Sequence, residues 1–65
     1  MTGDDLKTLR TRLGFTQEDL AERLGVRTNT VWRWENGQRH IPEMVVRLVQ
    51  YVAKEVHAEK KKKKA

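Results

Sequence analysis

The sequence predicts an all-α fold: a compact bundle of four short helices followed by a lysine-rich tail. Apolar residues recur at helical spacing through most of the 65 residues. Glycines and capping residues divide the chain into helix-sized segments, and no stretch alternates as a β-strand does. A chain of this length forms one domain, which we place at residues 1–57. Residues 58–65 have nothing to bury and are predicted to be a disordered basic tail.

The first two predicted helices cover residues 4–13 and about 17–24. Leucines three or four residues apart form the buried stripe of the first helix. Gly14 suits the left-handed conformation that often ends a helix. Thr16 is a good N-cap for the second helix, because Asp19 stands at the capping-box position.

The third predicted helix begins near Thr28 and ends at about Asn36. At about 100° per residue, Val31 and Trp34 lie on its inner side and polar residues lie on the opposite side. The outward residues are Thr28, Asn29, Trp32, Arg33 and Asn36.

The fourth predicted helix begins near Pro42, a favoured first-turn residue, and runs to about Val56. Its apolar stripe contains Val45, Leu48, Val49 and Val52, and it is flanked by Met44, Val46, Tyr51 and Ala53. This width exceeds the ~100° that a surface helix needs. We interpret the excess as a homodimer interface. The alternative is a small core that uses every apolar side chain available.

The net charge of +5 comes from the five lysines at residues 60–64, since residues 1–59 carry nine basic and nine acidic residues. Within that part the charge is uneven. Residues 1–22 carry three bases and five acids, whereas residues 23–47 carry five bases and two acids. This local positive excess favours a nucleic-acid partner. The lysines either add non-specific attraction to DNA or form an incidental tail.

Several functional classes are excluded by composition. The chain has no cysteine and no serine, so disulfides, thiolate metal sites and Ser or Cys nucleophiles are ruled out. His40 and His57 are too far apart to predict a metal site. The start of the chain lacks signal-peptide features, and no apolar run approaches the ~20 residues of a membrane span. We therefore expect a soluble cytoplasmic protein that is no enzyme and needs no metal or cofactor.

Residues 14–37 show the pattern of a helix-turn-helix, two short helices joined by a turn centred on Gly25. This pattern predicts sequence-specific binding to double-stranded DNA. Asn29 and Arg33 lie one turn apart on the outward face of the third predicted helix. Asn can bond adenine and Arg can bond guanine through two hydrogen bonds each, so both are candidates for base recognition. Thr28 can reach a phosphate, a base or a thymine methyl group.

The chain also resembles the Cro/repressor (XRE-like) helix-turn-helix family over residues 6–50. The matching positions are Leu9-Arg10, Gly14, Thr16-Gln17-Glu18, Leu20-Ala21, Leu24-Gly25-Val26, Thr30-Val31, Trp34-Glu35 and Gly37. The resemblance implies a lambda-repressor-like DNA-binding domain whose third helix enters the major groove.

The resemblance also implies roles for individual residues. Base contacts are expected from Thr28, Asn29 and Arg33. Trp32 either joins them, packing on sugars or a thymine methyl group, or covers a neighbouring side chain. Phosphate contacts are expected from Gln17, Arg27, Asn36, Gln38 and Arg39. Gln17 could instead only support its own helix, and His40 could be an ordinary loop residue.

Arg10 falls on the inward stripe of the first predicted helix, where an unpaired charge would be costly. Glu35 lies at the edge of the inner face of the third. The family forms a salt bridge between the matching positions, so we expect Arg10 and Glu35 to form a structural salt bridge here.

We interpret the chain as a transcriptional regulator, a repressor that binds a pseudo-palindromic operator as a homodimer through its fourth helix. The alternative is an antitoxin-like protein that neutralises a partner protein and regulates itself through the same helix-turn-helix. A basic membrane-surface peptide is disfavoured, because Glu43, Glu55 and Glu59 lie among the bases of the last helix.

Overall fold

One cluster of buried apolar side chains connects all four helices of the protein. The structure, a computed structural model, describes residues 1–64, with side chains up to Val56. The helices are α1 (Gly3–Arg12), α2 (Gln17–Leu24), α3 (Thr28–Glu35) and α4 (Glu43–Lys64). The cluster contains Leu6, Leu20, Ala21, Val31, Trp34, Ile41 and Val49. The described residues contain no strand, so the predicted all-α fold of four helices is confirmed.

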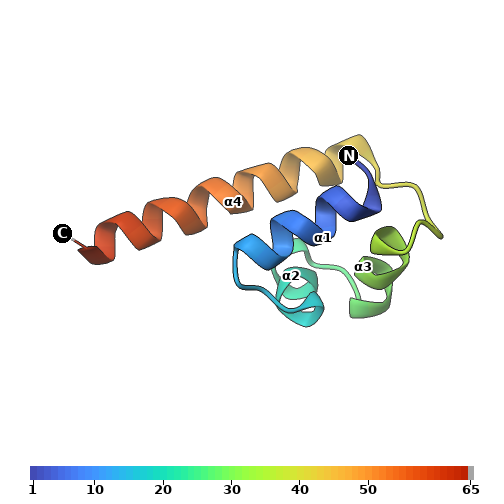
Figure 1. The fold of residues 1–65 in the computed structure, drawn as a ribbon, viewed down its shortest axis with the longest axis horizontal. Helices are drawn as coiled ribbons and strands as arrows, with labels where there is room; N and C mark the ends of the chain where they lie inside the picture. The colour runs from blue at the N-terminus through green and yellow to red at the C-terminus, as the bar shows by residue number, and fades with distance from the viewer. Residues whose placement is uncertain (65) are drawn as a thin grey trace.

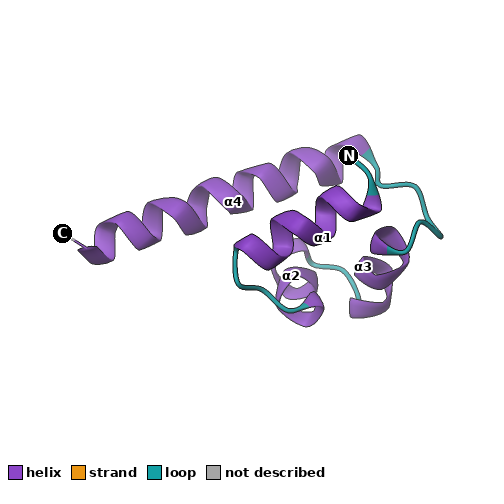
Figure 2. Cartoon of the chain, in the orientation of Figure 1, coloured by secondary structure: helices purple, strands orange, loops and turns teal. Residues whose placement is uncertain are grey.

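The first three helices form a small globule, and α4 runs along one side of it (Figure 1). Short loops join the helices, the longest connecting α3 to α4 (Figure 2). The C-terminal end of α4 lies at the far end of the molecule from α3. No helix in the described part of the chain is both long enough and apolar enough to cross a membrane.

The fourth helix departs from the sequence prediction in two ways. It continues to Lys64 instead of ending near Val56, because no glycine or proline follows Pro42 and Ala, Glu and Lys all favour helix. Leu48, expected in the buried stripe, is 40% exposed. The prediction of disorder concerns residues 58–65. Their side chains, and the whole of Ala65, lie outside what the structure describes. The boundary after residue 57 thus stays a prediction.

Each of the first two helices begins with a capping box. The main-chain N–H of Asp5 donates to the hydroxyl of Thr2 at 3.1 Å, and the N–H of Thr2 donates to the Asp5 carboxylate at 3.0 Å. Thr16 and Asp19 repeat the arrangement at 3.0 and 2.9 Å, which confirms the predicted cap of α2. Asp can take the place of Glu in the box, since the reciprocal bond is formed in both helices.

The turn between α2 and α3 depends on Gly25, which has φ = 72°. A residue with a side chain is strained at such a positive φ. The left-handed conformation of Gly25 lets the N–H of Val26 donate to the carbonyl oxygen of Ala21 at 3.0 Å. This bond satisfies one of the carbonyl groups at the C-terminal end of α2. Only three residues then separate the two helices, so α3 is held close against α2.

Gly3 marks a close approach that the sequence did not indicate. A Cβ atom at this position would lie 2.5 Å from the carbonyl oxygen of Trp34 and 2.6 Å from that of Glu35. The first turn of α1 therefore rests directly on the last turn of α3. This contact fixes the C-terminal end of α3 against the globule.

We predict that Gly3→Ala destabilises the fold, although Ala normally favours a helix over Gly. The new methyl group would overlap main-chain carbonyl oxygens, and overpacking of this kind costs about 1–3 kcal/mol. The free energy of unfolding from urea titration measures the effect. Thr8→Ala, at an exposed position of the same helix, is the control, and a Gly3→Ala protein as stable as that control would contradict the close approach.

We predict that the two capping boxes make stability depend on acid pH. Hydrogen bonds from the main chain and then the side chain of Thr2 lower the pKa of Asp5 below 3.8, and Thr16 does the same for Asp19. A carboxylate with a lowered folded pKa stabilises the fold above its unfolded pKa. That stabilisation is lost as pH falls from 3.8 through the folded values.

The measurement compares unfolding free energies at neutral pH and below pH 3.8. The double variant Asp5→Asn/Asp19→Asn is expected to lose less stability on acidification than the wild type. Thr8→Ala, at an exposed position of α1 and without a change in ionisable groups, should lose as much stability on acidification as the wild type does. If the double variant and the wild type lose the same stability on acidification, protonation of Asp5 and Asp19 is not coupled to folding.

Candidate nucleic-acid interface

The third helix separates its residues into a buried face and an exposed face. Val31 is fully buried, and Trp34 and Glu35 are 4% and 8% exposed. Four residues predicted to contact bases lie on the exposed side: Thr28, Asn29, Trp32 and Arg33. The structure therefore presents these hydrogen-bonding side chains together from one rigid helix.

Residues predicted to contact phosphates lie before and after this exposed face. Arg27 precedes α3, and Asn36, Gln38 and Arg39 follow it; all four are exposed. Asn36 also donates its side-chain amide to the carbonyl oxygen of Trp32 at 2.8 Å, so it helps to end α3. His40 is exposed in the same loop.

A buried network of three side chains joins α1, α2 and α3. Arg10 Nε donates to Glu35 Oε2 at 2.6 Å and Nη2 donates to Oε1 at 3.1 Å. The third arm of Arg10, Nη1, donates to the carbonyl oxygen of Phe15 at 2.8 Å. Gln17 completes the network, because its Nε2 donates to Glu35 Oε1 at 3.2 Å. The side chains of Arg10 and Glu35 are 13% and 2% exposed, so the geometry of the expected salt bridge is present and buried.

The position of Gln17 differs from that of the other predicted phosphate contacts. Its side chain is half-buried and bonded to Glu35, so it supports the joint between α2 and α3. The amide retains a second hydrogen, and Gln17 is also the first residue of α2, where main-chain N–H groups and the helix dipole favour anions. Gln17 has this supporting role because it bonds Glu35, which is 18 positions away in the sequence, and no local pattern indicated that bond.

The salt bridge also determines the charge of the exposed face of α3. Glu35 is the only acidic residue of α3, and its carboxylate is neutralised by Arg10 inside the globule. Arg33 is therefore the one charged side chain that α3 exposes. With Arg27 before the helix and Arg39 after it, this stretch exposes three positive charges, which suits a phosphate backbone.

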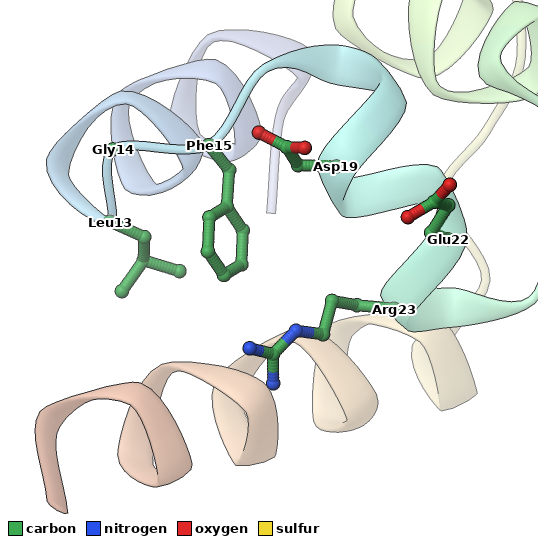
Figure 3. Close-up of a pocket in the computed structure, with 6 residues that line it drawn as sticks. All are labelled: Leu13, Gly14, Phe15, Asp19, Glu22 and Arg23. Carbon is green, nitrogen blue, oxygen red and sulfur yellow. The ribbon is translucent and has the colours of Figure 1, made fainter. Parts of the chain in front are cut away.

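A shallow pocket on another part of the globule contains none of the predicted DNA contacts. Its lining residues are Leu13, Gly14, Phe15, Asp19, Glu22 and Arg23 (Figure 3). The guanidinium carbon of Arg23 lies 5.4 Å from the centre of the Phe15 ring, a cation–π contact between α2 and the loop that precedes it. We interpret these residues as part of the scaffold.

The arrangement of α2, the turn at Gly25 and α3 is that of a helix-turn-helix, with the polar face of the second helix exposed. A family model described as a helix-turn-helix domain matches residues 3–53, which is most of the chain. The chain belongs to the helix-turn-helix domain family. No curated protein and no solved structure matches the chain significantly.

Membership of this family makes the protein a DNA-binding regulator in the general sense. The match begins at Gly3, where α1 contacts α3, and extends into α4 beyond the buried Val52. The family therefore includes the flanking helices that support the helix-turn-helix domain, as well as α2 and α3.

We predict that loss of either partner of the buried ion pair destabilises the helix-turn-helix domain. Removing one partner strands the other, typically at about 3–5 kcal/mol. Arg10→Met should cost more than Glu35→Gln, because Glu35 is 2% exposed while Arg10 keeps 13% contact with water. Chemical denaturation of both variants measures the effect.

The matched control is Arg47→Met. Arg47 Nη2 lies 3.6 Å from Glu43 Oε1, and the two side chains are 79% and 83% exposed. A pair of this kind contributes about 0–1 kcal/mol, so the control should stay near wild-type stability. Equal effects of Arg10→Met and Arg47→Met would contradict a structural role for the buried pair.

Proposed function

We propose that this protein is a transcriptional repressor that binds a specific double-stranded DNA sequence by inserting α3 into the major groove. The observation that carries the proposal is the composition of the exposed face of α3. That face offers hydrogen-bonding groups and one positive charge. The only acidic residue of α3, Glu35, is buried in a salt bridge. Occupation of the groove is enough to block other proteins from the same site, which supports repression.

Base recognition is assigned to Thr28, Asn29 and Arg33. Asn29 and Arg33 are one helical turn apart and suit adenine and guanine edges respectively. Trp32, which is 41% exposed, lies beside Asn29 on the same face and offers its ring to sugars or a thymine methyl group. Phosphate contacts are assigned to Arg27, Asn36, Gln38 and Arg39, and to Gln17 through the groups that its bond to Glu35 leaves free.

We further propose that two copies bind a pseudo-palindromic operator. Half-sites about one helical turn apart, ~34 Å, suit two helix-turn-helix domains on one face of the duplex. The exposed apolar side chains of α4 support association through that helix. Selection of bound sequences from random duplex DNA tests the proposal. Enrichment of a two-fold symmetric sequence is expected, and recovery of no preferred sequence would refute it.

An antitoxin-like function is the second candidate, and it is favoured by the same exposed side chains of α4. A partner protein would then cover them, and DNA binding would serve autoregulation. A stable complex with an unrelated protein, isolated from native cells, would favour this function. Isolation of the chain on its own, with full DNA affinity, would favour the repressor.

We predict that Arg33→Ala and Asn29→Ala each relax preference at one base pair per half-site without unfolding the protein. Both side chains are exposed, so neither substitution leaves a cavity. Each lost two-bond contact should cost about 1–3 kcal/mol of discrimination. Non-specific affinity should fall slightly for Arg33→Ala, which loses a charge, and should not change for Asn29→Ala.

The measurement is a binding profile of each variant against duplexes substituted at every position. Thr8→Ala, on the exposed surface of α1, is the control and should keep the wild-type profile. If both α3 variants also keep the wild-type profile at every position, the recognition surface lies elsewhere.

A further inference from the structure

One large aromatic side chain interrupts the polar exposed face of α3. Trp32 is 41% exposed and lies outside the core cluster, whereas Trp34 is 4% exposed and belongs to it. Exposure of an indole ring to water is unfavourable, because most of its surface is apolar. Trp32 is therefore the side chain of this face that gains most when another apolar group covers it.

The main chain at Trp32 is held in a fixed position. Its carbonyl oxygen accepts two hydrogen bonds from Asn36, one from the side-chain amide at 2.8 Å and one from the main-chain N–H at 3.0 Å. Val31, the preceding residue, is fully buried in the core. The ring of Trp32 is thus presented from an anchored part of the helix.

The direction of Trp32 agrees with a contact to the bases. The exposed residues of α3 and its C-cap, which lie between Thr28 and Arg33 around the helix axis, span about 140°. Trp32 and Asn29 lie about 30° on either side of the centre of this arc. When α3 lies in the major groove, Trp32 points toward the base edges as directly as Asn29 does, and the sugars lie farther to the side.

Among the four bases, one offers an apolar group in the major groove. Thymine carries a C5 methyl group there, while the other bases present hydrogen-bond donors and acceptors. An indole ring placed over those polar groups would displace their water without replacing all of its hydrogen bonds. A methyl group has no hydrogen bonds to lose. The exposed ring is therefore complementary to a pyrimidine that carries a methyl group at C5.

We propose that Trp32 is a specificity-determining residue that reads the C5 methyl group of one pyrimidine in each half-site. This role rests on the proposed function and deepens it, because it names the chemical group that is recognised. The contact depends on the methyl group and not on the base that carries it. Methylation of cytosine at C5 creates the same group, so 5-methylcytosine at that position is bound better than cytosine.

The first experiment removes the methyl group from the DNA and leaves the protein unchanged. Each thymine of the duplex obtained by selection is replaced in turn by uracil, which keeps the same hydrogen-bonding groups and lacks only the methyl group. Burial of one methyl-sized group is worth about fourfold in affinity. The wild type should lose about this factor at one thymine per half-site. Undiminished affinity at every position would overturn the proposal.

The second experiment assigns the effect to Trp32. Trp32→Ala should bind the thymine and uracil duplexes equally at that position, and Trp32→Phe, which keeps an aromatic ring, should retain part of the preference. If Trp32 packs on sugars instead, Trp32→Ala binds every duplex more weakly and keeps the wild-type ratio of the two affinities, which would overturn the proposal. Since the compared quantity is a ratio between two duplexes, a partly unfolded variant does not alter it.

Tyr51→Ala is the matched control, because it removes an aromatic side chain that is 60% exposed on α4, away from the exposed face of α3. This variant should keep the wild-type ratio of thymine to uracil affinity at every position. A ratio changed as much by Tyr51→Ala as by Trp32→Ala would contradict a specific role of Trp32.

The third experiment places the methyl group on a different base. The sensitive thymine–adenine pair is replaced by a cytosine–guanine pair, with and without a methyl group at C5 of the cytosine. The wild type should prefer the methylated duplex, and Trp32→Ala should not distinguish the two. Equal binding of both duplexes by the wild type would contradict recognition of the methyl group itself.

These outcomes separate the role of Trp32 from the proposed function. A wild-type protein without sequence preference on any duplex refutes both. A wild-type protein that selects a sequence, yet binds its thymine and uracil forms equally, retains the DNA-binding function and refutes only the role of Trp32.

Discussion

The carboxylate of Glu35 is buried at the end of α3, and side chains from α1 and α2 bind it there. Arg10 from α1 donates two hydrogen bonds to it, and Gln17 from α2 donates a third. A buried charge is tolerated only when it is paired and hydrogen-bonded. The requirement to satisfy this one carboxylate therefore restricts the positions of α1 and α2 relative to α3. Because Arg10 also binds the carbonyl oxygen of Phe15, the loop between α1 and α2 is held by the same network.

The same network connects structure to recognition. The proposed function requires α3 to hold its exposed side chains in a reproducible position, and α3 has only eight residues with which to do so. Its inner residues are fixed by the core through Val31 and Trp34, and its last turn is fixed by the contact with Gly3. With its acidic residue neutralised inside the globule, the exposed face is left with hydrogen-bonding groups and a positive charge. Stability and electrostatic suitability for DNA thus have one source.

The fourth helix has one apolar side that supports the core and another that faces solvent. Through Val49 it joins the core that holds α1, α2 and α3 together. Its other apolar side, with Met44, Leu48 and Tyr51, is exposed and lies outside that core. The globule covers only one side of α4, so buried and exposed apolar side chains occur on the same turns of the helix.

Much of the fold and of the candidate interface could be predicted from local patterns. Thr16 and Asp19 form the expected capping box, Gly14 and Gly25 take the left-handed conformation, and the two faces of α3 are as the helical period predicts. These features depend on residues within one or two turns of each other, so sequence spacing is sufficient to reveal them. The pairing of Arg10 with Glu35 was also foreseen, because an inward charge needs a partner and the family resemblance named it.

Other features were decided by tertiary structure alone. The bond from Gln17 to Glu35 and the approach of Gly3 to the end of α3 join residues 18 or more positions apart, and neither has a local signature. Leu48 was assigned to the core by its apolar character, yet it is exposed because the globule covers only one side of α4. The sequence by itself determined where the helices begin and which faces are apolar. Only the packing of α1, α2 and α3 decided which of those faces is buried, since burial depends on the finite area that distant segments present.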